Sequence, residues 1–172
     1  PLVKFDHNAG HEDKPEDESY VRATGHPHYR ADDALWLFPT VYKYVAETGN
    51  KDFLNEVIPY ADFDEGTVLD HLKRAIDFSM NHLGVHGMPA GLHADWNDCL
   101  NLNCFSEDPN ESYQTTGNRV GRTAESIFIA GMFCQIAPMY AELVEKRGDA
   151  AEGKRAREAS AKMSDTVLKH GW

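Results

Sequence analysis

The stretch RTAESIFIAGMFCQIAPMYAELVEKRG, residues 122–148, decides the fold of this 172-residue chain. Up to Tyr140 its helical pattern is apolar on almost all sides. A helix with this pattern is buried on most of its surface, because no single face can be turned to solvent. The stretch therefore predicts a central helix around which the rest of the chain packs.

Two further helices are predicted from amphipathic patterns on either side of this stretch. Residues 149–171, DAAEGKRAREASAKMSDTVLKHG, follow after a short turn at Gly148 and Asp149. Residues 67–84, TVLDHLKRAIDFSMNHLG, have Thr67 as a helix cap and Gly84 as a stop signal. The apolar stripe of this second helix requires a partner helix. It consists of Val68, Leu69, Leu72, Ile76, Met80 and Leu83.

The pattern of residues 32–50, DDALWLFPTVYKYVAETGN, predicts another helix, which Asp32 or Asp33 can cap and Gly49 can end. Pro39 lacks a backbone donor, so we expect a kink there or a helix that begins close to it. KDFLNEVI, residues 51–58, predicts a short helix ended by Pro59.

These patterns predict an all-α fold, because no segment shows convincing strand alternation. Antiparallel helix pairs joined by loops of unequal length are typical of a toroid of helix hairpins. Residues 1–30 are polar and loop-rich, and residues 31–172 carry the helices. The chain has no initiator Met and stops on Trp172, so we expect it to be a segment of a longer polypeptide.

Composition narrows the classes of function. The chain is 41% hydrophobic and 26% charged, which is typical of a soluble globular protein. Its net charge of −11 argues against binding to nucleic acid or to an anionic membrane surface. We expect no membrane-spanning segment, since we find no apolar run of about 18 residues. The odd set of Cys99, Cys104 and Cys134 favours reduced thiols in a cytoplasmic protein.

The most informative polar motif is GLHADWNDCLNL, residues 91–102, inside a loop-rich stretch over 84–121. A loop of that length in a compact domain usually carries function. One interpretation is structural, with an Asp capping a turn that starts at Trp96. A second is a metal site of His93, Asp95 and Asp98, but this spacing matches no strong zinc or calcium pattern. His26 and His28 beside Asp32 and Asp33 are an equally weak metal candidate.

A third interpretation is a glycosidic general acid. Trp96 offers an apolar face on which a sugar ring can stack, and Asn97 offers an amide for sugar hydroxyls or for holding a carboxyl group. An Asp beside an indole and away from cations loses solvation, so its pKa rises. A carboxyl group that stays protonated can then protonate a leaving glycosidic oxygen.

Several segments resemble the catalytic domain of glycoside hydrolase family 94, the family of cellobiose phosphorylase. The resemblance runs from about residue 29 to residue 172, in the right order. It is carried by DDALWLFPTVYKYVAETGN (32–50), ADWNDCLNLNCFS (94–106), GRTAESIFIAGMF (121–133) and LKHGW (168–172). It implies that residues 31–172 are part of an (α/α)6 barrel, of which a full copy needs about twelve helices.

The resemblance also implies an activity and a set of roles. The activity is inverting phosphorolysis of a β-linked disaccharide, which gives an α-sugar 1-phosphate and a free sugar. The general acid is the second Asp of the DWND motif, Asp98, and Trp96 lines the site beside the scissile bond. Asn97 and Asp95 complete the candidate substrate-binding group, although we interpret Asp95 mainly as a turn or supporting residue.

Phosphate is already an anion, so a phosphorylase needs no base carboxylate to activate water. Phosphate instead needs Arg, His, hydroxyl or amide donors. Arg30, Arg119 and Arg122 are candidates for binding phosphate on charge alone. We expect the phosphate site outside this chain. No cofactor or metal is expected. The remaining candidates near the site are Asn101, Asn103, Gln114, Thr115, Thr116 and Glu125.

We interpret Glu125 chiefly as a charge at a helix N-terminus, with a sugar contact as the alternative. Trp36 and Tyr42 are interpreted as core residues. CLNLNCFS, residues 99–106, favours cellobiose as substrate, with chitobiose, laminaribiose and cellodextrins left open. The rival functions are a hydrolase or transferase on a related barrel and a non-catalytic carbohydrate-binding helical module. We expect a homodimer in the full-length protein.

Overall fold

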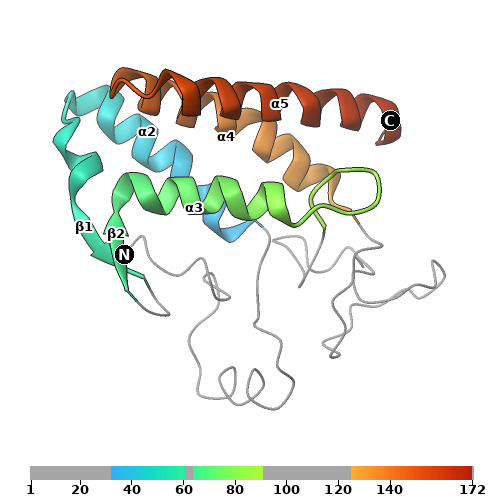
Figure 1. Ribbon diagram of the computed structural model, residues 1–172, viewed down its shortest axis with the longest axis horizontal. Coiled ribbons are helices and arrows are strands. Elements are labelled where there is room, and N and C mark those ends of the chain that lie inside the picture. Colours follow the sequence, from blue (N-terminus) through green and yellow to red (C-terminus); the bar gives the residue numbers. More distant parts are fainter. Residues whose placement is uncertain (1–31, 61–63, 91–124, 172) are drawn as a thin grey trace, which may run out of the picture.

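The computed structural model describes residues 32–60, 64–90 and 125–171. These residues form a helical arrangement with one short hairpin (Figure 1). In chain order the elements are η1 (Asp33–Trp36), α2 (Leu37–Thr48), η2 (Asp52–Asn55), β1 (Val57–Pro59), β2 (Glu65–Thr67), α3 (Val68–Asn81), α4 (Ile127–Lys146) and α5 (Ala150–His170).

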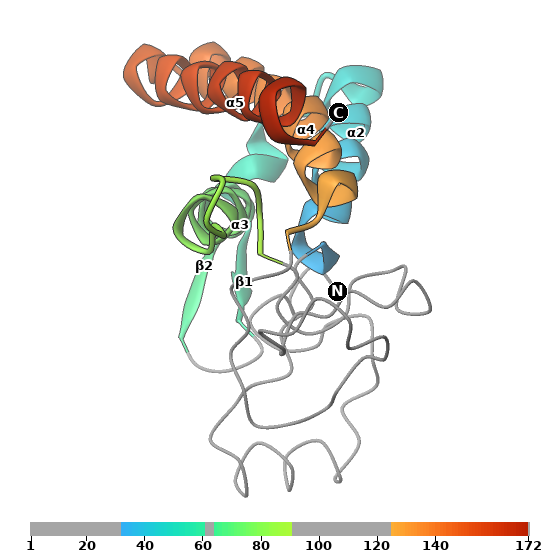
Figure 2. The ribbon, with the colours of Figure 1, turned by 90° about the vertical axis from the view of Figure 1, so that its right-hand side faces the viewer.

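Helix α4 is the central element, as its apolar pattern predicts. Its side chains Phe133, Ala137 and Tyr140 are at most 1% exposed. Helix α5 lies antiparallel along it after a turn in which Gly148 has a φ of 94°, a backbone conformation that suits glycine. Helices α2 and α3 contact other parts of α4 (Figures 1 and 2).

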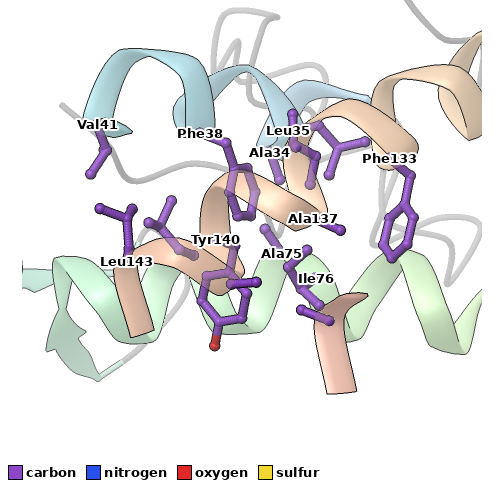
Figure 3. Packing of buried hydrophobic residues seen from close by; sticks show 14 of the residues in the cluster. Ala34, Leu35, Phe38, Val41, Ala75, Ile76, Phe133, Ala137, Tyr140 and Leu143 are labelled. Carbon is purple, nitrogen blue, oxygen red and sulfur yellow. The ribbon is translucent and has the colours of Figure 1, made fainter. Parts of the chain in front are cut away.

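The core lies where α2, α3 and α4 meet (Figure 3). The rings of Phe38 on α2 and Tyr140 on α4 pack edge to face, with their centroids 6.1 Å apart. Leu72 and Ile76 reach the same core from α3 and are fully buried. The stripe predicted for residues 67–84 therefore has the partner helix that it requires.

The first helix begins close to Pro39, as predicted, since η1 passes into α2 at Leu37. Proline is tolerated in a first turn, where its missing N–H would have no helical acceptor. Gly49 ends α2 in a left-handed conformation and donates its N–H to Val45. The prediction that Asp32 or Asp33 caps this helix was wrong for Asp32. No side-chain cap bond forms, and Asp32 Oδ2 accepts a hydrogen bond from Trp36 Nε1 at 3.1 Å.

One short hairpin forms within the all-α fold, where the sequence showed no convincing strand alternation. The helix predicted over residues 51–58 is only the short η2, and the chain then extends into β1. β1 pairs antiparallel with β2, with Val57 opposite Thr67. Branched side chains at Val57 and Ile58 favour an extended backbone. Tyr60 covers Gly66 so closely that a β-carbon there would lie 2.3 Å from the Tyr60 hydroxyl.

Helix α3 has the predicted start and an earlier end. Thr67 Oγ1 accepts from the Asp70 N–H at 3.1 Å, and the Asp70 carboxylate accepts from the Thr67 N–H, so the two form a capping box. The predicted stop at Gly84 was late. The helix ends at Asn81, and His82 Nδ1 lies 2.8 Å from the carbonyl oxygen of Phe78.

Helix α4 corrects the expectation that no apolar run reaches about 18 residues. Within the ranges that the structure describes, it is the one helix long and apolar enough to span a membrane, with a mean hydropathy of 1.6. Half of that window is buried inside the protein. Burial of this kind is typical of the core helix of a globular domain.

A charged cluster at the hydroxyl end of Tyr140 joins α3, α4 and α5. Arg155 on α5 bonds Glu152 through two nitrogens and reaches Asp77 on α3 at 2.7 Å. The Tyr140 hydroxyl donates to Glu152 Oε1 at 2.9 Å. The hydrogen bonds from Arg155 hold the pKa of the Glu152 carboxyl below its usual value of 4.5.

Truncation of the central aromatic contact should destabilise the fold strongly. We expect Phe38→Ala to lower the free energy of unfolding by about 3–5 kcal/mol, because it leaves a cavity beside Tyr140. Tyr44→Ala on the same helix removes a ring that is 42% exposed and should cost about 1 kcal/mol. Chemical denaturation of the intact protein measures both. Equal losses would contradict the core assignment.

Acid should weaken the cluster around Glu152. A carboxyl group whose native pKa is lowered contributes stability above its unfolded pKa and loses that stability as the pH falls through its native pKa. Glu152→Gln should therefore cost about 1–3 kcal/mol at pH 7 and progressively less below pH 4.5. The matched control is Glu158→Gln on the exposed face of α5. An unchanged cost between pH 7 and pH 3 would refute the assignment.

Candidate functional site: the stem of the DWND segment

Pro89 and Ala90 lie beside Glu125 and Ser126 at the start of α4, and we call these four residues the stem. Ala90 and Glu125 pair as an antiparallel bridge, and the N–H of Ser126 donates to the carbonyl oxygen of Pro89 at 2.9 Å. The whole segment over residues 91–124 therefore begins and ends at adjacent positions. The DWND motif belongs to this segment.

The loop on one side of the stem folds back on itself after α3. Leu83 pairs with Pro89, and the N–H of Gly84 donates to Met88 O at 2.8 Å. Ala90 N–H donates to the His82 carbonyl oxygen at 2.9 Å. We call residues 82–90 the stem loop. Figure 1 shows it beside the first turn of α4 and below the C-terminal end of α5.

Glu125 holds the stem loop through its carboxylate. Oε1 accepts hydrogen bonds from the backbone N–H groups of His86, Gly87 and Met88, each at 3.0 Å. Oε2 lies 2.6 Å from His86 Nδ1. The Glu125 side chain is only 4% exposed. Consecutive amides that point at one oxygen form a concave anion site, which here is filled from within the chain.

Glu125 lies at the N-terminus of α4, as interpreted from the sequence, and its carboxylate also bonds the stem loop. The residue precedes α4, whose cap is Ser126, with Oγ accepting from the Ile129 N–H at 3.2 Å. The loop contacts of Glu125 were missed from sequence. Two features of the sequence signal these contacts. GVHGM, residues 84–88, has two glycines that allow close backbone approach, and the acidic Glu125 directly precedes the Ser126 cap.

The stem loop also rests on α5. The rings of His86 and His170 lie 4.9 Å apart between centroids, at an interplanar angle of 37°. A β-carbon on Gly87 would lie 3.8 Å from the Thr166 side chain. The last turn of α5 thus supports the loop that Glu125 binds, and three helices fix the stem.

Trp36 differs from its interpretation as a core residue, whereas Tyr42 packs against the core. Trp36 is 47% exposed, and its indole nitrogen bonds the fully buried Asp32 beside η1. Tyr42 is partly buried against the core, and its hydroxyl donates to Glu142 at 2.6 Å. Figure 2 shows η1 and the start of α4 on the same side of the helices, away from α5.

The predicted acid Asp98 and its neighbours Asp95, Trp96 and Asn97 lie outside the described residues, as do both metal candidates apart from Asp32 and Asp33. The remaining undescribed candidates are Arg30, Cys99, Asn101, Asn103, Cys104, Gln114, Thr115, Thr116, Arg119 and Arg122. Across the described ranges, no group of three or more His, Cys, Asp or Glu side chains is placed to hold a metal ion. Cys134 is a free thiol whose pKa is raised by burial.

Comparison with known proteins decides the family. The model of the glycosyl hydrolase 94 superfamily catalytic domain matches residues 2–172. The chain belongs to this family. Its membership and the helical architecture together confirm the predicted fold class, part of an (α/α)6 barrel.

Curated relatives match parts of the chain. The N,N'-diacetylchitobiose phosphorylase of Vibrio proteolyticus is 56% identical over 72 residues, which are 42% of this chain and 9% of that protein. The solabiose phosphorylase of Paenibacillus borealis is 31% identical over 146 residues, which are 85% of this chain and 17% of that protein. The cyclic beta-(1,2)-glucan synthase NdvB of Rhizobium meliloti is 28% identical over 167 residues, with 83% of this chain and 5% of that protein covered. The chain thus spans less than a fifth of the length of each.

Proposed function

We propose that the protein carrying this chain is an inverting phosphorylase of β-linked disaccharides, with Asp98 as its general acid. The observation that carries the proposal is the family match over residues 2–172, which includes the DWND motif. Relatives with phosphorylase names support the reaction type. The buried carboxylate of Glu125, which accepts hydrogen bonds from three backbone N–H groups of the stem loop, supports a functional role for the segment.

The stem supports this proposal because a general acid has to be held in a fixed place. Asp98 lies in the sequence between Ala90 and Glu125, and both of these residues are held by hydrogen bonds or bridge pairing to their neighbours. A general acid works only when its proton lies within hydrogen-bond reach of the leaving oxygen. A fixed stem supplies the rigid base that such placement requires.

The proposed chemistry needs one carboxyl group. Asp98 gives its proton to the glycosidic oxygen as the bond from C1 to that oxygen breaks, and a phosphate oxygen attacks C1 from the opposite face. The products are an α-sugar 1-phosphate and a free sugar. Trp96 and Asn97 bind the sugar, and Asp95 supports the turn. We place the phosphate-binding residues outside this chain.

Cellobiose is the substrate that the CLNLNCFS stretch favours. The 56% identity to an N,N'-diacetylchitobiose phosphorylase supports that disaccharide as the second candidate. Incubating the intact protein with phosphate and each disaccharide in turn, and measuring the sugar 1-phosphate formed, discriminates between them. Preference for N,N'-diacetylchitobiose would overturn the choice of cellobiose and leave the reaction type intact.

Removal of the proposed acid should abolish most of the activity. We expect Asp98→Asn to lower kcat/KM for phosphorolysis by about 100- to 10,000-fold, the usual contribution of a general acid. Asp95→Asn is the matched control and should lose less than about 10-fold. The assay measures sugar 1-phosphate released by the intact protein. Near wild-type phosphorolysis by Asp98→Asn would rule out the acid.

Phosphate dependence separates the proposal from its rivals. A phosphorylase should cleave the disaccharide only when phosphate is present, whereas a hydrolase releases free sugar without it. Binding of the disaccharide with no turnover, even with phosphate added, would favour a carbohydrate-binding module. Either outcome would refute the proposed phosphorolysis.

A further inference from the structure

We propose that Glu125 is a positioning residue for the reaction, acting through the stem that bears the Asp98 segment. The inference rests on the proposed function, because it assigns Glu125 the task of placing the acid. Glu125 does not itself contact substrate in this proposal. Its carboxylate ties the stem loop to the start of α4, and so fixes where the segment leaves the helices.

The first support is the way the stem loop encloses the carboxylate. Three consecutive backbone N–H groups, of residues 86–88, converge on Oε1. A β-carbon on Gly84 would lie 2.3 Å from Glu125 Cγ, so the loop closes around this side chain. Gly87 has a φ of 95°, a conformation that L side chains rarely adopt. The loop is therefore shaped to receive this one carboxylate.

The second support is the strength expected of these bonds. The Glu125 side chain is 4% exposed, although the His86 side chain beside it is 51% exposed. Hydrogen bonds to a charged acceptor are about twice as strong as neutral ones. Removal of the carboxylate would take the acceptor from the partly buried amides of Gly87 and Met88 and from the more exposed His86.

The third support is location along the chain. Ala90 and Glu125 are bridge partners, and Asp98 lies between them in the sequence, eight residues after Ala90. In this proposal a displacement of the stem displaces Asp98. A misplacement of about 1 Å in a reacting group can cost about 100-fold in rate.

The hydrogen bonds of the Glu125 carboxylate fall into two groups that can be tested separately through His86. Its backbone N–H bonds Oε1, whereas its ring bonds Oε2 and lies against His170. Glu125→Gln keeps an oxygen for the three amides and loses the acceptor for the ring. His86→Ala keeps the amide and loses the ring. Glu125→Ala removes both parts.

The experiment compares two substrates in the intact protein. The disaccharide needs a proton on its leaving oxygen, whereas a 2,4-dinitrophenyl β-glycoside of the same donor sugar releases a stable phenolate and needs none. A variant in which the acid is misplaced should lose activity on the disaccharide and keep most of it on the aryl glycoside. General loss of structure would lower both rates together.

We expect Glu125→Ala to lower kcat on the disaccharide by about 100-fold, with KM changed less than about 3-fold. On the aryl glycoside the loss should stay below about 5-fold. Glu125→Gln should recover most of the rate, because the amides keep their acceptor. Glu145→Gln, which breaks a bidentate contact with Arg157 far along α4, is the control and should have no effect on either substrate.

The outcomes distinguish this inference from the proposed function. An active Asp98→Asn variant would overturn the function itself. A strongly impaired Asp98→Asn with an unimpaired Glu125→Ala, or with a Glu125→Ala equally slow on both substrates, would overturn the positioning role alone. If Glu125→Ala does not fold, His86→Ala decides: a loss on the disaccharide with the aryl glycoside rate kept supports the positioning role, and no loss or equal losses on both substrates refute it.

Discussion

Burial of α4 is the constraint on which the rest of the structure depends. A helix that is apolar on almost every side has no face to offer to water, so its neighbours are arranged to cover it. Helix α5 covers one side, and α2 and α3 bring Phe38, Leu72 and Ile76 against others. Polar contacts such as those of Glu152 lie at the margin of this packing, where part of each charged group still reaches solvent.

The sequence predicted the long helices well because their signals are strong and local. Apolar periodicity, the Thr67 cap and the stop at Gly49 each act within a few residues. The hairpin of β1 and β2 was missed, since each strand is only three residues long and shows no alternation. The end of α3 was misjudged because His82 binds a carbonyl of the last turn, an interaction that composition does not reveal.

The chemistry of the site stays a prediction, whereas its support became visible only in the structure. DWND carries residue types that suit a general acid and a sugar platform, and these roles rest on the motif alone. The contacts of Glu125 join residues nearly forty positions apart in the chain, and they depend on tertiary packing, which neither spacing nor periodicity encodes. Trp36 is different, since it bonds Asp32 only four residues earlier and is 47% exposed.

The bridge between Ala90 and Glu125 brings together two residues that are 35 positions apart in the sequence. Because both ends of the intervening segment are fastened at one point, its length is nearly independent of the helices that hold it. Loop-closure entropy grows slowly, by about 0.6 kcal/mol for each doubling of length. A change in the number of residues between Ala90 and Glu125 should therefore alter the entropy of closure little, as long as the bridge is kept.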